Sequence, residues 1–296
     1  MTGPILDALI VGVPKAGTTW LATQLMEHPE IDLPEKKELN LIATRQGTFK
    51  RGNQEPDLDS YERFFNGNGL KIDASIHSFA CSEAPRRFFE LNNDLRIVLV
   101  LREPVERTFS HWKMIIDTKE DSRNKCDWSD FKIAWDDDRL QADSLYATSM
   151  ACWLETFPLK NFMIIDNKQM RDNPSEVLDE VGDFLGISAF DYDLNPDLKA
   201  NRAADRRRIN PLGRVMKTSF SLIPKFIRRP IAKRLQKRGV DIYSGKLVSS
   251  KTPDIELSDE HYSVCGEQLV EELIRFQAMT NFDTNHWINA IQDRMT

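Results

Sequence analysis

The sequence predicts a three-layer α/β/α fold, in which helices cover both faces of a central parallel sheet. Three apolar runs, at residues 5–13, 96–101 and 161–165, show the near-continuous hydrophobic pattern of strands buried on both faces. Segments with helical periodicity and recognisable ends separate these runs. Because strands that alternate with helices usually form parallel sheets, we expect a ligand site at the carboxyl ends of the strands.

Several expected helices begin or end at residues that commonly start or stop a helix. His28-Pro29 should end the first helix, Pro104 suits the first position of another, and Gly186 should end a third. The expected helices are residues 21–27, 59–65, 83–91, 104–116, 130–135, 144–157, 174–185, 257–280 and 283–295, with extended segments at 31–34 and 70–73 and polar loops at 45–57 and 117–127.

The length fits one large α/β domain or two smaller ones, and the composition is that of a globular protein. The 296 residues are 41% hydrophobic and 29% charged, which is ordinary for a soluble protein. The four cysteines are scattered, with no C-x-x-C pair and no histidine cluster, so neither a disulfide framework nor a structural zinc site is expected. No signal peptide is visible, and no apolar run approaches the ~20 residues that span a bilayer. We therefore expect a cytoplasmic protein with a single domain, residues 1–296.

The first apolar run leads directly into a loop with the composition of a phosphate-binding site. Gly12 and Gly17 allow the backbone to turn and to approach a ligand closely. Thr18 and Thr19 place hydroxyl and amide donors at the start of a helix, where anions bind readily, and Lys15 adds a positive charge. The candidate ligand-binding residues are Pro14, Lys15, Ala16, Gly17, Thr18, Thr19 and Trp20.

The order of residues in this loop differs from that of a Walker A motif. Walker A places lysine after the second glycine, in G-x-x-x-x-G-K-[ST], whereas Lys15 precedes Gly17. The order P-K-x-G-T-T-W instead resembles the 5′-phosphosulfate loop of the sulfotransferases that use 3′-phosphoadenosine-5′-phosphosulfate (PAPS). This resemblance implies a P-loop-like fold, with PAPS as co-substrate and residues 14–20 around its 5′-phosphosulfate.

A second stretch resembles the segment that binds the 3′-phosphate in the same enzymes. Residues 96–112, RIVLVLREPVERTFSHW, are similar to the family's strand followed by R-x-P-x-x-R-x-x-S. The resemblance implies that Arg102 and Ser110 bind the 3′-phosphate, and a guanidinium group is suited to bidentate phosphate contacts. Arg107 has two alternatives, a contact in this site or an ion pair with Glu103 on the helix surface.

The resemblance extends, more weakly, over much of the chain. Residues 157–187 look like the family's third strand and the helix after it, and residues 257–276 resemble its C-terminal helix. Sulfuryl transfer should pass in line through a loose transition state, so catalysis depends on positioning and electrostatic stabilisation. The resemblance implies that Lys15 neutralises charge on the leaving 5′-phosphate. No metal is required, and the sequence shows no carboxylate cluster that would hold one.

Two residues compete for the role of the base that takes the acceptor's proton. Residues 28–42 resemble the region in which Golgi-type carbohydrate sulfotransferases and many bacterial relatives place a catalytic glutamate, which implies Glu38; a solvated charge cluster is the alternative. His77 follows an expected strand end that faces the same cleft, although it could be structural. Some carbohydrate sulfotransferases carry a lysine in an E-K-[ST]-P stretch, where this chain has Ala74, which argues against a glycosaminoglycan-type acceptor. His111 is expected to pack or to contact the cofactor.

A strongly basic segment follows the part that carries these motifs. Residues 199–238 contain fourteen Lys and Arg against the single acid Asp205, although the net charge of the chain is −6. Such a block suggests an anionic partner, and we expect a basic, partly helical insertion at about 199–250. Family members often close the 3′-phosphate site with a basic loop, which implies Arg202 and Arg206 as further cofactor-binding residues.

Residues 224–238 combine an apolar helical stripe with basic side chains. Such a helix can lie on an anionic membrane, or it can pack its stripe on the core and keep its charges in water. We expect a small-molecule, lipid or carbohydrate acceptor, bound by loops at 43–57, 117–129 and 199–250. Nucleic acid is not expected, because the basic segment has few aromatic residues. The alternatives to a sulfotransferase are a P-loop nucleotide kinase and a non-enzymatic basic protein at the membrane surface.

Overall fold

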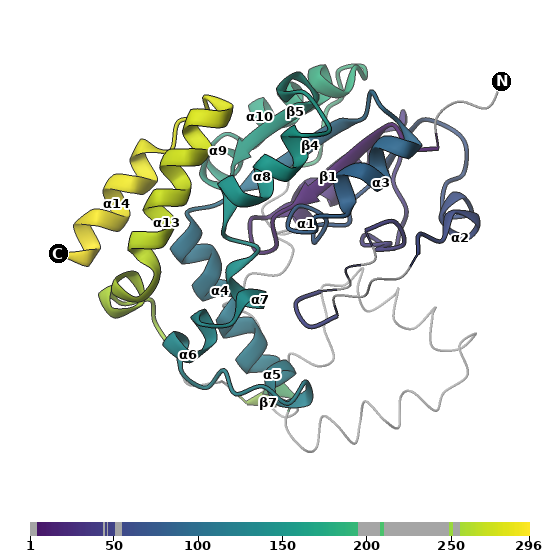
Figure 1. Ribbon diagram of the computed structural model, residues 1–296. Coiled ribbons are helices and arrows are strands. Elements are labelled where there is room, and N and C mark those ends of the chain that lie inside the picture. The colour runs from purple at the N-terminus through teal and green to yellow at the C-terminus, as the bar shows by residue number, and fades with distance from the viewer. Residues whose placement is uncertain are drawn as a thin grey trace.

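The central sheet has five strands, and every neighbouring pair is parallel (Figure 1). The computed structural model describes residues 5–43, 45, 47–50, 55–194, 208–209, 249–250 and 255–296. The strands lie in the order β2-β3-β1-β4-β5, which confirms the predicted central parallel sheet. Their bounds are β1 Ala8–Gly12, β2 Ile31–Asp32, β3 Leu70–Asp73, β4 Arg96–Leu101 and β5 Phe162–Asp166.

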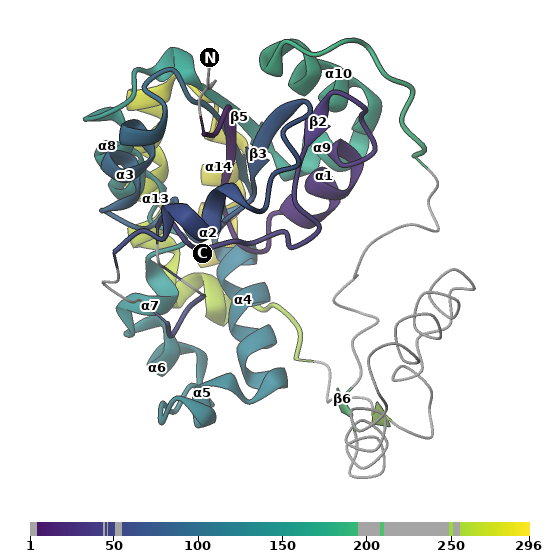
Figure 2. The same cartoon turned by 90° about the vertical axis from the view of Figure 1, so that its right-hand side faces the viewer.

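Helices cover both faces of this sheet. Their bounds are α1 Thr18–Leu25, α2 Leu58–Glu62, α3 Ala84–Leu91, α4 Pro104–Thr118, α5 Glu120–Arg123, α6 Phe131–Trp135, α7 Asp138–Gln141, α8 Tyr146–Leu154, α9 Asn167–Asp172, α10 Pro174–Leu185, α13 Asp259–Thr280 and α14 Asn285–Met295, with a 3-10 turn at Leu159–Asn161. Figure 2 shows α1, α9 and α10 on one side of the sheet and α3, α8 and α13 on the other. The predicted three-layer α/β/α fold is therefore confirmed. A separate antiparallel pair joins β6, Arg208–Ile209, to β7, Ser249–Ser250.

The apolar runs predicted to be strands are strands whose side chains are buried on both faces of the sheet. Every residue of β1 is buried, and in β4 only Arg96 is partly exposed. The guanidinium of Arg96 donates a hydrogen bond to the Leu185 carbonyl, which ties the start of β4 to the end of α10. Because β1 lies between β3 and β4, the chain reverses its direction of winding at β1. Such a reversal opens a crevice at the carboxyl ends of the two strands, where ligands of open α/β sheets bind.

Three short helices lie where the sequence did not predict a helix. They are α5, inside the expected loop at 117–127, and α7 and α9. α7 and α9 begin at aspartate caps, in which Asp137 accepts the Arg139 N–H at 3.0 Å and Asp166 accepts the Lys168 N–H at 2.7 Å. Helices of four to six residues are too short to show an apolar repeat, so the sequence pattern gave no signal.

The long C-terminal helix α13 packs against α8 and α14 on one face of the molecule (Figure 1). Trp287 of α14 is 4% exposed, as expected of a side chain that docks on the core. Within the described ranges, no helix is both long enough and apolar enough to cross a bilayer.

Candidate active site

A cavity of about 490 Å³ opens at the carboxyl ends of the central strands. It brings together residues from segments far apart in the sequence, namely the loop after β1, the segment after β2, the loop after β3 and the start of α4. Ala16 is buried in the wall of the loop rather than exposed to the cavity. The other predicted site residues that line the cavity are Pro14, Lys15, Gly17, Thr18, Thr19, Trp20, Glu38, His77, Arg102 and Ser110.

The loop between β1 and α1 is held in shape by its backbone and by a side chain of α9. Gly17 has a φ of 95°, in the left-handed region that glycine adopts without strain. The Asn167 amide donates a hydrogen bond of 2.6 Å to the Ala16 carbonyl. A Cβ atom at Gly17 would lie only 2.9 Å from that amide nitrogen and 2.6 Å from the Met170 methyl group. The loop therefore lies close against α9, and its donors and the N-terminus of α1 face the cavity.

Lys15, the positively charged residue of this loop, lies where two cavities meet. Its ammonium group lies 3.8 Å from the Met114 sulfur on α4. Lys15, Arg102, Ser110 and Met114 line both the main cavity and a smaller one of about 270 Å³. An elongated ligand could therefore contact the loop at one end and the start of α4 at the other.

Arg102 follows β4 directly, at the point predicted from the sequence. Its guanidinium donates to the Glu106 carboxylate at 2.7 and 3.1 Å, and its carbonyl accepts the Tyr146 hydroxyl at 2.7 Å. Glu103 caps α4 by accepting the Val105 and Glu106 N–H groups at 3.0 and 2.6 Å. Burial raises the pKa of Glu103 to about 7, in spite of these hydrogen bonds. Arg102 is thus held at the mouth of the cavity by a rigid helix start.

The loop between β1 and α1, residues 13–17, is called the phosphate-type loop below. Glu38 lies near this loop because its neighbour Lys37 contacts the start of α1. The Lys37 ammonium donates to the Thr18 hydroxyl at 3.2 Å and lies 3.6 Å from a Glu38 carboxylate oxygen. Burial lowers the pKa of Lys37, and the Glu38 carboxylate opposes that shift. The Lys37 ammonium therefore contacts the first residue of α1, the helix that follows the loop with Lys15.

The segment that carries Glu38 is fastened to the end of β3. The Asn40 N–H donates to the Ser75 hydroxyl at 2.9 Å, and this hydroxyl donates to the Asp73 carboxylate at 2.7 Å. The Tyr61 hydroxyl donates to the other Asp73 oxygen at 3.1 Å. Burial raises the pKa of Asp73 to about 6. Asp73 therefore links α2, β3 and the segment that carries Glu38.

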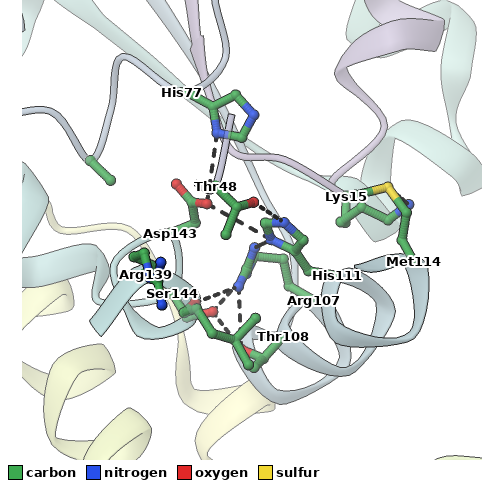
Figure 3. A network of polar contacts seen from close by, with 12 residues as sticks. Lys15, Thr48, His77, Arg107, Thr108, His111, Met114, Arg139, Asp143 and Ser144 are labelled. Atoms are coloured by element: carbon green, nitrogen blue, oxygen red, sulfur yellow. Dashed lines mark hydrogen bonds and ion pairs between the residues drawn. The ribbon is translucent and has the colours of Figure 1, made fainter. Parts of the chain in front are cut away.

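His77 belongs to a buried polar network that reaches the cavity wall (Figure 3). Its Nδ1 lies 3.8 Å from Asp143 Oδ2, and His111 Nδ1 lies at the same distance from the same oxygen. His111 also contacts Arg107 Nη1 at 3.0 Å and the Thr48 hydroxyl at 2.7 Å. His77, His111 and Thr48 all line the cavity.

Arg107 takes neither of the two places expected for it. Its side chain is completely buried, so it forms no surface ion pair with Glu103. It donates to the Ser144 hydroxyl at 2.6 Å and to the Leu140 carbonyl at 3.3 Å, and it contacts His111. Its guanidinium therefore fastens α4 to α7 and to the segment after it, and no pattern in the sequence indicated those partners.

The sequence of this chain matches a known protein family over most of its length. Residues 6–203 match the family described as the sulfotransferase domain, and this stretch includes the phosphate-type loop, Arg102 and Ser110. The chain belongs to the sulfotransferase domain family. The predicted family resemblance is thus confirmed.

Curated sulfotransferases in mouse share part of their length with this chain. Heparan sulfate glucosamine 3-O-sulfotransferase 5 is 25% identical over 191 residues, which cover 61% of this chain and 53% of that protein. Bifunctional heparan sulfate N-deacetylase/N-sulfotransferase 3 is 29% identical over 196 residues, which cover 61% of this chain and 22% of that protein. The chain therefore spans about half the length of the first relative and about a fifth of the second.

A sulfotransferase crystal structure from Alicyclobacillus acidocaldarius shows that the fold is shared. It superimposes with a TM-score of 0.63 at 19% identity, and the match covers 97% of this chain and 99% of that one. At this level of identity the likeness concerns the fold alone.

The main cavity also contains residues that the sequence did not single out. Thr48 and Glu120 come from regions expected to be loops, where polar side chains carry no readable pattern. Asn167 and Arg171 come from the unexpected helix α9. Asn167 comes immediately after the carboxyl end of β5, and that position was the one signal that could have indicated it.

Some predicted site residues lie outside the part of the chain that the structure describes. These are Arg202 and Arg206, together with residues 224–238 and most of the basic segment. Among the described residues, no group of three or more His, Cys, Asp or Glu side chains could hold a metal ion.

Proposed function

We propose that this protein transfers a sulfuryl group from PAPS to a hydroxyl or amine of a small-molecule, lipid or carbohydrate acceptor. The observation that carries this proposal is the pair of cationic positions in one cavity. Lys15 lies in the loop before α1, Arg102 lies just before α4, and Ser110 lies about two turns into α4. PAPS carries anionic groups on both its 5′ and 3′ oxygens, so it needs two such positions.

The residues present fit the donor. The helix N-terminus, the loop amides and the hydroxyls of Thr18 and Thr19 would hold the 5′-phosphosulfate. Arg102 and Ser110 would hold the 3′-phosphate, with Arg102 exchanging its contact to Glu106 for a phosphate contact. Asn167 would keep the loop in the required shape through its bond to the Ala16 carbonyl.

The reaction exchanges one sulfur–oxygen bond for another bond to sulfur. The bond between sulfur and the 5′-phosphate oxygen breaks, and the acceptor's oxygen or nitrogen bonds to sulfur as it loses its proton. Lys15 would stabilise the negative charge that develops on the leaving oxygen. Glu38, which lines the same cavity, would take the acceptor's proton. His77 is the alternative base, because it also lines this cavity.

The curated relatives suggest a carbohydrate among the possible acceptors. Two of them are named for sulfation of heparan sulfate or its glucosamine. Ala74 stands where some carbohydrate sulfotransferases carry a lysine, so the acceptor contacts of those enzymes need not transfer to this chain. Contact of residues 224–238 with an anionic membrane, and a cytoplasmic location, remain predictions from the sequence.

A thermal-shift measurement with two nucleotides tests the proposed activity. 3′,5′-adenosine bisphosphate, the product of PAPS, should raise the melting temperature, because a ligand that binds only the folded state stabilises it. ATP with Mg²⁺ should have no comparable effect, because the lysine lies before the second glycine. Stabilisation by ATP with Mg²⁺ alone would instead favour the nucleotide kinase, and no response to either nucleotide would favour a protein without this activity.

A further inference from the structure

Asp143 is a buried carboxylate that has no part in the proposed donor binding or proton transfer. It is 2% exposed and lies in the segment between α7 and α8, on the protein side of the cavity wall. Its Oδ2 atom and the Nδ1 atom of His77 are both buried, and neither has a hydrogen-bond partner among the described residues. The two atoms face each other at 3.8 Å (Figure 3). A shift of less than 1 Å would make them a hydrogen-bonded pair, and such contacts often tighten only when substrate is bound.

The charge of Asp143 is maintained by its surroundings. Burial alone would raise the pKa of this carboxyl group, but the neighbouring His77 and the guanidinium of Arg107 lower it. Arg107 is completely buried and carries a permanent positive charge close to this site. Asp143 is therefore an ionised group, which can accept hydrogen bonds but cannot donate them.

His111 cannot supply the missing donor to Asp143. Arg107 has only donors, so the 3.0 Å contact to its Nη1 requires a lone pair on His111 Nδ1. Burial, together with the charge of Arg107, lowers the pKa of His111 well below its usual range. The single ring proton of His111 is then on Nε2, which donates to the Thr48 hydroxyl at 2.7 Å.

His77 remains as the only described ring that can offer an N–H to this carboxylate, and that N–H must be on Nδ1. In the neutral ring, the other nitrogen, Nε2, then carries a lone pair. A Cβ atom built on Gly47 would lie 3.9 Å from Nε2, and both Gly47 and His77 line the cavity. The ring edge that carries Nε2 therefore lies beside Gly47, another residue of the cavity wall.

We propose that Asp143 is a positioning residue, which holds His77 in the Nδ1–H tautomer so that Nε2 accepts a hydrogen bond from the acceptor's hydroxyl or amine. The identity of the bound group rests on the proposed sulfuryl transfer, but the tautomer does not. A hydroxyl that donates its only proton to Nε2 passes that proton to His77, whereas an amine or a water molecule keeps a second proton that Glu38 can remove.

The tautomer can be read directly by long-range ¹H–¹⁵N correlation spectra of protein labelled at its five histidines. His77→Gln assigns the His77 signals. At alkaline pH, wild-type His77 should be protonated on Nδ1 and not on Nε2. Asp143→Asn should populate the Nε2–H tautomer, whereas Asp136→Asn, a change at an exposed position before α7, should leave the spectrum unaltered. A wild-type His77 protonated on Nε2, or an unaltered tautomer in a folded Asp143→Asn variant, would overturn the proposal.

A kinetic measurement with water as the nucleophile separates this proposal from the proposed function. Slow release of 3′,5′-adenosine bisphosphate from PAPS should fall by about tenfold in Asp143→Asn and His77→Gln, because a positioned group is lost. Binding of the bisphosphate itself, measured by calorimetry, should stay within about twofold, and Asp136→Asn should match wild type in both assays. Wild-type protein that neither binds the bisphosphate nor releases it from PAPS would contradict the sulfotransferase activity, while the spectra would still decide the role of Asp143. Unaltered release in Asp143→Asn, with binding intact, would reject that role alone.

Discussion

At the scale of single residues, the structure assigns physical roles to side chains that hold others in place. Asp73 is 1% exposed and accepts hydrogen bonds from Ser75 and Tyr61, and through Ser75 it fixes the segment that carries Glu38. Its burial costs free energy once it is ionised, since a charge is then removed from water. Asp73 therefore links the pH dependence of folding to the position of the candidate base.

Asp73→Asn should change how stability depends on pH. Because the folded-state pKa of Asp73, about 6, lies above its ordinary value of 3.8, the stability that the protonated group contributes is present below pH 4 and is lost as the pH rises through 6. Wild type should therefore lose up to about 3 kcal/mol relative to Asp73→Asn between pH 4 and 7. Urea denaturation at a series of pH values measures this difference.

Asp57 supplies a control of opposite sign for that series. It caps α2 by accepting the Ser60 N–H at 3.0 Å, and hydrogen bonds from the Ser60 side chain and from this N–H lower the pKa of Asp57. The ionised Asp57 carboxylate therefore contributes to folding stability at neutral pH, and this contribution is lost as the pH falls. Wild type should gain stability relative to Asp57→Asn as the pH rises. A difference between wild type and Asp73→Asn that does not vary with pH would show that Asp73 is not the titrating group.

At the scale of elements, the loop between β1 and α1 depends on its contact with α9. In Gly17→Ala, the new methyl group would meet the Asn167 amide, which holds the Ala16 carbonyl. We expect a loss of at least about 1–2 kcal/mol from the left-handed backbone, together with a tenfold or greater loss of affinity for 3′,5′-adenosine bisphosphate. Thermal unfolding and calorimetry measure the two effects.

Gly67→Ala is the matched control for that variant. Gly67 also has a positive φ, of 81°, but a Cβ atom there would meet nothing within 4 Å. The Gly67→Ala variant should therefore lose folding stability as Gly17→Ala does, but should keep its affinity for 3′,5′-adenosine bisphosphate. Equal affinity in both variants would mean that the contact with α9 does not shape the ligand-binding loop.

The sequence was most informative where a functional residue adjoins a long apolar strand. Lys15 and Arg102 follow β1 and β4 almost directly, so the strand pattern and the rule that ligands bind at carboxyl ends placed both in one cleft. Asp143 and Thr48 could not be predicted in the same way, because they lie in short irregular segments that tertiary packing brings to His111 and His77. The complete burial of Arg107 was missed for the same reason, since its partners Ser144 and Leu140 lie more than 30 residues away in the sequence.

At the scale of the whole molecule, the sheet order places the two cationic positions on either side of one crevice. β1 and β4 are neighbours, so the loop after β1 and the helix after β4 face each other across the cavity. The same fold extends over 97% of the chain in the Alicyclobacillus acidocaldarius sulfotransferase, at only 19% identity. The architecture is thus retained while most side chains differ.

The central claim is that one ligand contacts the phosphate-type loop with its 5′ end and Arg102 with its 3′-phosphate. The most direct test compares the affinities of 3′,5′-adenosine bisphosphate and adenosine 5′-monophosphate, by calorimetry, for wild type and Arg102→Ala. Loss of the contact to the 3′-phosphate should weaken binding of the bisphosphate by roughly 10- to 100-fold and leave the monophosphate unaffected. Equal weakening of both nucleotides, or of neither, would contradict the assignment of Arg102 to the 3′-phosphate.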